Sequence, residues 1–151
     1  MEPEESPALG SALEFMRLLW ALAHGMQSRS KRMEAALGVT GPQRLVIRIL
    51  GRSPGVTAGA LAKAMCVHPS TLTGILRRLE SRGLVEKKRD RADGRKVLLM
   101  LSPAGKKLDS HQSGTTEAAV RRTLGRLEVG QVEIARNVID LLTKEIARTD
   151  R

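Results

Sequence analysis

The stretch from Thr57 to Leu101 constrains the fold most, because it holds two helical signals, a short break between them and a charged hairpin. Thr57 is a good N-cap residue, and the spacing of the apolar residues after it predicts a helix over residues 57–65. The side chains expected to be buried in this helix are Leu61, Ala64 and Met65. After a break at residues 66–68, Pro69 suits the first position of a second helix, because its missing N–H would have no partner there.

The second predicted helix, residues 69–82, has two distinct faces when each residue is turned by 100°. Its core face consists of Leu72, Ile75, Leu76 and Leu79. The opposite face carries hydroxyls and arginines, which donate to phosphates and to base edges, and a guanidinium fork can bind guanine. Gly74 lies on that face at a cost to the helix of about 1 kcal/mol relative to alanine, which a close approach to a DNA groove would explain. The candidate DNA-binding residues here are His68, Ser70, Thr71, Thr73, Gly74, Arg77, Arg78 and Ser81.

A charged hairpin follows over residues 84–101, read as strand, turn and strand. From Arg77 to Lys96 nine Lys or Arg stand against four acidic residues, a local net charge of 9 − 4 = +5. An ordinary solvated face is the alternative interpretation of such a run, but its place directly after a reading helix favours nucleic acid. The order of elements suggests a winged helix-turn-helix. Its candidate wing contacts are Lys87, Lys88, Arg89, Arg91, Asp93, Arg95 and Lys96.

These residues resemble the MarR-type transcriptional regulators: the helix STLTGILRRLESRGLVEK, the wing with Asp93 and Arg95 around a glycine, and the strand ending LSPAG. The resemblance implies that the second helix enters the major groove and that Arg95, with Arg91 beside it, reaches the minor groove. It also implies that Asp93 orients the wing through a salt bridge. Two departures from the family, His68 at the cap and Gly74 on the reading face, mean that base preference does not carry over.

The chain of 151 residues carries a net charge of +10, which favours anionic partners such as double-stranded DNA. With one Phe, one Trp and no Tyr, base stacking on aromatic side chains, as in single-strand and RNA binders, has almost no support. No apolar run approaches the ~20 residues of a membrane span, and the start lacks signal-peptide features. One cysteine excludes an internal disulfide. We therefore expect a cytoplasmic protein without membrane partners.

The segments that flank this lobe predict helices for dimerisation. Residues 1–8 read as a disordered acidic tail, residues 9–37 as one long amphipathic helix, and residues 104–151 as C-terminal helices interrupted near 113–116 and resumed over 118–127. The lobe itself spans 38–103, with Val56 as a minimal third strand. In the family such flanking helices interlock between two subunits, which implies a homodimer. The candidate interface residues are Leu9, Leu13, Met16, Val132, Val138, Ile139, Leu142 and Ile146.

A further helix is expected after Gly38 and Val39, with Thr40 as its cap and Pro42 in its first turn. Its expected buried positions are Leu45, Val46, Ile49 and Leu50. The final segment, residues 128–148, is expected to pack on the first long helix. The whole reads as a mainly α fold with a small β-wing.

Few residues suggest other chemistry. No HExxH, CxxC, phosphate-binding loop or nucleophile elbow is present, so we expect neither an enzyme nor a cofactor. Cys66 and His68 lack two further metal ligands; Cys66 is read as a small packed residue rather than a redox sensor, and His68 as a helix cap or phosphate contact. Trp20, Met26 and Met33 are read as core, with an effector pocket as the alternative.

The resulting hypothesis is a sequence-specific regulator, a repressor acting as a homodimer on a pseudo-palindromic operator, and the resemblance allows for an unidentified small-molecule effector. A DNA-coating architectural protein is the alternative that charge alone supports. A thiol-based redox regulator is a further one.

Overall fold

The computed structural model describes residues 8–148, so the expected acidic tail, apart from Ala8, lies outside the described residues. The chain divides into two compact units, residues 1–112 and 113–151, and each is described by itself. No helix among the described residues is long and apolar enough to cross a membrane.

Helix α1 (Ser11–Leu37) confirms the long helix predicted over residues 9–37, although it begins two residues after Leu9. Gly10 is its N-cap, and Gly38 closes it with a φ of 72°, a left-handed conformation that glycine adopts without steric cost. Arg17 donates to Glu14 near the start of the helix, and this hydrogen bond lowers the pKa of the Glu14 carboxyl.

Helix α2 (Gly41–Arg52) begins at a capping box formed by Thr40 and Gln43. The Gln43 N–H donates to Thr40 Oγ1 at 3.4 Å, and the Thr40 N–H donates to Gln43 Oε1 at 3.1 Å. The predicted burial of Leu45 is wrong, since this side chain is 47% exposed. The buried face is turned toward Arg44 and Ile47 instead, because α2 packs against α5 as well as against the motif helices.

The two motif helices are α3 (Ala58–Met65) and α4 (Pro69–Ser81). Thr57 caps α3 by accepting from the Ala60 N–H at 3.2 Å, as predicted. The predicted burial of Ala64 is wrong: Ala64 is exposed and Ala62 is buried, because α3 turns its Leu61 and Ala62 side toward its neighbours α2 and α4.

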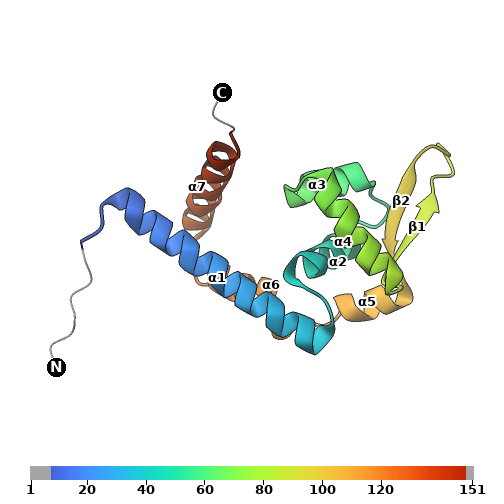
Figure 1. Cartoon of the computed structure of the whole chain (residues 1–151), viewed down its shortest axis with the longest axis horizontal. Coiled ribbons are helices and arrows are strands. Elements are labelled where there is room, and N and C mark those ends of the chain that lie inside the picture. The colour runs from blue at the N-terminus through green and yellow to red at the C-terminus, as the bar shows by residue number, and fades with distance from the viewer. Residues whose placement is uncertain (1–7, 149–151) are drawn as a thin grey trace. The chain divides into compact units, whose positions relative to one another are not determined.

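The wing consists of β1 (Val85–Arg89) and β2 (Val97–Leu101), paired antiparallel with Val85 opposite Leu101 and Arg89 opposite Val97. The sheet has two strands, and a single antiparallel bridge between Val56 and Leu99 stands in place of the predicted minimal third strand. Figure 1 shows the hairpin projecting from the lobe beside α4.

The remaining helices are α5 (Pro103–Asp109), α6 (Thr116–Leu124) and α7 (Val129–Ala147). The helical signal is broken between α5 and α6, as predicted, although both helices begin and end a few residues earlier than expected. Thr115 begins α6 by accepting from the Ala118 N–H at 3.3 Å. These two last helices, α6 and α7, form the second unit.

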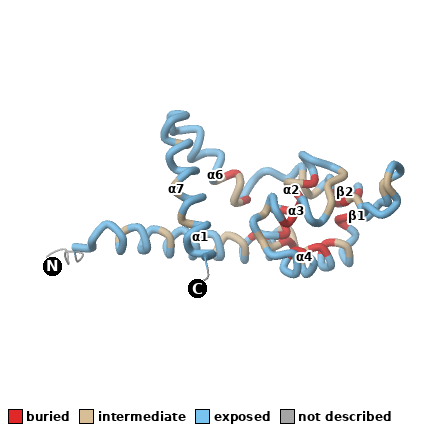
Figure 2. Tube along the Cα trace, turned by 90° about the horizontal axis from the view of Figure 1, so that it is seen from above, coloured by how far each residue is buried: buried red, intermediate tan, exposed pale blue. Residues whose placement is uncertain are grey.

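One hydrophobic core lies in the first unit, where Figure 2 shows the buried positions gathered among α2, α3, α4 and the wing. Its members are Val39, Val46, Ile47, Leu50, Leu61, Ala62, Leu72, Leu76, Leu79, Leu84, Val85, Leu99 and Leu101. By contrast, α7 has no buried residue, and most of α1 is exposed. The core therefore holds the motif helices and the wing together and leaves apolar surface on the flanking helices.

Candidate nucleic-acid interface

The recognition helix α4 is started by His68, which caps it as predicted. His68 Nδ1 accepts from the Ser70 N–H at 3.2 Å and lies 2.7 Å from Ser70 Oγ. Pro69 occupies the first helical position, where no N–H is required. If the ring is neutral, this acceptor role of Nδ1 assigns the proton to Nε2, which has no hydrogen-bond partner among residues 8–148.

The turn before α4 corrects the interpretation of Cys66 as a packed residue. Cys66 is exposed and ends α3 in a left-handed conformation with a φ of 54°. The short connection to Pro69 requires the chain to reverse here, and the left-handed residue makes that reversal while its N–H bonds back to Lys63 O at 3.1 Å.

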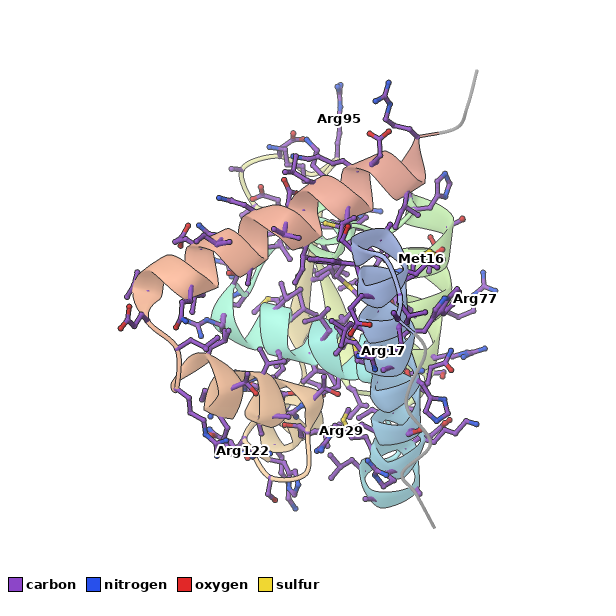
Figure 3. All side chains as sticks on the ribbon, turned by 90° about the vertical axis from the view of Figure 1, so that its left-hand side faces the viewer. Met16, Arg17, Arg29, Arg77, Arg95 and Arg122 are labelled. Carbon is purple, nitrogen blue, oxygen red and sulfur yellow. The ribbon has the colours of Figure 1, made fainter. Side chains whose placement is uncertain are left out.

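The two faces of α4 separate as the spacing predicted. Leu72, Leu76 and Leu79 are buried, and Ile75 is partly buried against them. All the candidate contact residues from His68 to Ser81 are exposed. Arg77 and Arg78 have no intramolecular side-chain hydrogen bond or ion pair within residues 8–148, and Figure 3 shows Arg77 projecting away from the lobe. Their guanidinium donors are therefore uncommitted.

The hydroxyl groups on this face, unlike the arginines, already donate hydrogen bonds within the protein. Thr73 Oγ1 donates to Pro69 O at 2.9 Å, and Ser81 Oγ donates to Arg78 O at 2.9 Å. Both protons are thus used within the helix, while the oxygens can still accept. The donors that this face of α4 can offer to an outside partner come mainly from its arginines.

The wing tip is shaped by two aspartates that accept from the backbone. Asp90 Oδ1 accepts from the Ala92 N–H at 3.0 Å, and Asp93 Oδ1 accepts from the Arg95 N–H at 3.1 Å. The expected salt bridge of Asp93 is not among the ion pairs of the described residues; a short Asp side chain two residues before an N–H favours this local bond instead. Arg95 projects from the tip (Figure 3).

Two contacts near the junction of α4, the wing and α5 were not predicted from the sequence. Lys87 Nζ lies 3.0 Å from Glu80 Oε1, which ties β1 to α4 and partly commits one predicted DNA-binding lysine. Ser102 Oγ donates to Gly83 O at 2.6 Å and accepts from the Gly105 N–H at 3.0 Å. The Ser102-Pro103 pair is a helix-start signal that could have indicated the second contact.

The remaining wing candidates, Lys88, Arg89, Arg91 and Lys96, are all exposed. The predicted interface residues, apart from Leu9, lie on the flanking helices α1 and α7. Leu13, Met16, Ile139 and Ile146 are exposed, and Val132, Val138 and Leu142 are half-buried, whereas Leu9 precedes α1 rather than belonging to it. Met33 is buried, as the core interpretation predicted, but this interpretation is wrong within the single chain for Trp20 and Met26, which are 70% and 50% exposed. No described residues form a candidate metal cluster.

A winged helix-turn-helix with an exposed, basic reading helix defines a DNA-binding protein. Comparison with known proteins narrows this class. The sequence model of the MarR family matches residues 39–97. The chain is 30% identical over 106 residues to the HTH-type transcriptional repressor Rv2887 of Mycobacterium tuberculosis, covering 70% of this chain and 76% of that protein.

A second sequence relative and a solved structure support the same family. The chain is 32% identical to the transcriptional regulator HosA of Escherichia coli over 96 residues, which cover 64% of this chain and 71% of that protein. A solved structure of a MepR-like protein complexed with pseudoligands superposes with a TM-score of 0.71 at 26% identity, over 94% of this chain and 100% of that one. The chain belongs to the MarR family: it is a DNA-binding transcriptional regulator, not an enzyme.

Proposed function

We propose that the protein is a repressor that binds a pseudo-palindromic operator as a homodimer, with α4 in the major groove and the wing in the neighbouring minor groove. The observation that carries the proposal is the uncommitted pair Arg77 and Arg78 on an exposed helix face, next to a wing whose arginines are also exposed. A relative with 30% identity is named a transcriptional repressor, which supports the direction of regulation.

Exposed apolar surface supports the homodimer. Leu13, Phe15, Trp20 and Leu22 on α1 are each at least half exposed, and α7 adds Ile139 and Ile146. A monomeric protein rarely exposes so many large apolar side chains to water. In a symmetric dimer, the second copy would cover these side chains on both subunits. A small-molecule effector is part of the proposal, supported by the pseudoligands bound to the MepR-like protein.

Selection of bound sequences from random duplex DNA, followed by footprinting at moderate salt, tests the proposal. We expect a two-fold symmetric consensus and a bounded footprint, because each recognition helix of a dimer reads one half-site. Uniform protection without a consensus would instead mean a DNA-coating protein, the function that the +10 net charge alone would support.

A further inference from the structure

Helix α2 carries a second, basic face that meets α5 rather than solvent. Arg44 and Arg48 are one helical turn apart and Gly51 follows one turn later, so the three positions lie along one side of α2. Arg44 is 1% exposed, and the Arg48 side chain is 22% exposed. Charged side chains are almost never buried this deeply unless polar partners compensate them.

Their partners are carbonyl groups at the carboxyl end of α5. Arg44 Nη1 donates to Leu108 O at 2.5 Å, and Arg44 Nη2 donates to Asp109 O at 3.4 Å and to His111 O. Arg48 Nη1 donates to Asp109 O at 3.1 Å and to Asp109 Oδ1 at 2.6 Å. The last carbonyls of a helix lack helical partners and carry partial negative charge, so the two guanidiniums cap α5 from a neighbouring helix. We call these five residues the arginine clamp.

Gly51 leaves room for the acidic member of the clamp. A Cβ added at Gly51 would lie 2.3 Å from Asp109 Oδ2 and 2.8 Å from Asp109 Cγ. The carboxylate of Asp109 therefore rests on bare backbone while its other oxygen accepts from Arg48. An alanine at this position would have to push the carboxylate away from Arg48.

Stability alone does not explain a buried arginine, because well-packed apolar residues at such positions are often as stabilising or more so. What a guanidinium fork adds is direction, since its planar donors hold several acceptors in one arrangement. The clamped carbonyls belong to the last residues before the chain leaves the first unit at Gln112. The second unit begins with Ser113 and Gly114, whose φ is 70°.

We propose that Arg44 and Arg48 are positioning residues that hold the point where the chain leaves the DNA-binding unit, and thereby set the spacing between the two recognition helices of the dimer. The inference rests on the proposed function, because only a dimer has a half-site spacing to set. Without the clamp, residues 108–112 lengthen the connection between the lobe and the helices α6 and α7, and α1 remains the lobe's other connection to the dimer surface. The two lobes then accept a wider range of half-site spacings.

The test uses the full-length chain as wild type, Arg44→Met and Gly51→Ala. Each is titrated with a duplex that holds a single half-site, with the native operator, and with operators lengthened by two or four base pairs. Arg52→Met is the matched control, because it removes the same charge from an exposed position of α2. Thermal unfolding midpoints are measured for all four proteins.

Wild type and Arg52→Met should lose about tenfold or more in affinity when the spacing changes, as dimers that read half-sites a fixed distance apart do. Arg44→Met and Gly51→Ala should keep half-site affinity within about twofold and lose about tenfold on the native operator, because ordering the lobes then costs entropy. Their preference between spacings should fall below about threefold.

Unchanged spacing preference in both variants would overturn the inference. Equal loss on half-site and operator, together with a lower unfolding midpoint, would make the clamp merely structural and would also overturn it. Gly51→Ala guards against misfolding of the other variant, because it keeps every charge and favours the helix. A wild type without spacing preference would instead refute the dimeric operator itself.

Discussion

Arg77 is the residue that the proposed function assigns most directly to base recognition. Its guanidinium is exposed on α4 beside Gly74, and the helix hydroxyls around it donate to their own backbone. Arg77→Ala should cost about 1 to 3 kcal/mol on the operator and relax preference at a few positions, because the variant can no longer donate to a base edge. Binding to random duplex should change less.

The measurement compares the variant on operator, mutated operators and random duplex at one salt concentration. Lys107→Ala serves as the control, because it removes the same charge from α5 and should leave base preference unchanged. An Arg77→Ala protein that loses equal affinity on every duplex would assign Arg77 to the phosphates.

Replacing Gly74 with alanine should have opposite effects on stability and on DNA binding. A Cβ built there meets no atom within 4 Å, so alanine fits the free protein without strain. Gly74→Ala should raise the free energy of unfolding by up to about 1 kcal/mol through helix propensity. If α4 approaches the groove closely at this point, operator affinity should fall, and urea denaturation and operator titration measure the two effects separately. Unchanged affinity would show that the helix stands back from the DNA here.

At the scale of elements, the wing combines a fixed tip with exposed charges. Asp90 and Asp93 hold the turn through backbone hydrogen bonds, and the Arg95 side chain projects outward. Arg95→Ala should weaken both operator and random-duplex binding, because the negative potential of the phosphates attracts a guanidinium on any duplex, and most strongly where the minor groove is narrow. The slope of log affinity against log salt should become shallower by about 0.9 for each phosphate that the variant no longer neutralises.

A salt series on both duplexes, with unfolding followed in parallel, checks the wing prediction. The fold should survive, because the tip lies outside the core. Unaltered affinity and slope would mean that the charged hairpin is only a solvated surface.

The joint between the reading helix, the wing and α5 depends on a glycine. A Cβ added at Gly105 would lie 2.1 Å from Leu84 O and 3.2 Å from Leu101 Cδ2. Gly105→Ala should lower the free energy of unfolding by about 1 to 3 kcal/mol, because backbone must move to admit the methyl group. Gly59→Ala is the matched control, a helical glycine with open space around it. Urea denaturation measures both variants. Equal urea midpoints for Gly105→Ala and Gly59→Ala would contradict the prediction.

At the scale of the whole molecule, the proposed dimer predicts an effect far from the DNA. Val138 lies on the apolar side of α7, and Val138→Asp would bury an unpaired charge in the interface at a cost of several kcal/mol. The variant should sediment as a monomer at micromolar concentration and lose operator affinity. Asn137→Asp places the same charge one residue away on the polar side and should keep both. A Val138→Asp dimer with full affinity would exclude this face from the interface.

Local sequence signals predicted most of the elements correctly. Thr40, Thr57 and Pro69 mark helix starts whose chemistry acts within a single turn, and the alternation of Leu72, Leu76 and Leu79 with polar residues defines the faces of α4. Such signals need no knowledge of distant residues. The same is true of the turn between the two wing strands.

Only the tertiary structure decided which side of α2 is buried and why Leu45 is exposed. The side of α2 that carries Arg44 is buried because Arg44 donates to the carbonyls of Leu108, Asp109 and His111, which lie 64, 65 and 67 residues further along the chain. Hydrophobic periodicity carries no information about contacts at such a separation. The exposure of Cys66 likewise depends on how α3 and α4 meet. Sequence alone determined the class of protein, because a reading helix and a charged wing are local patterns. The packing between elements determined their burial, because it depends on contacts that form only when distant segments come together.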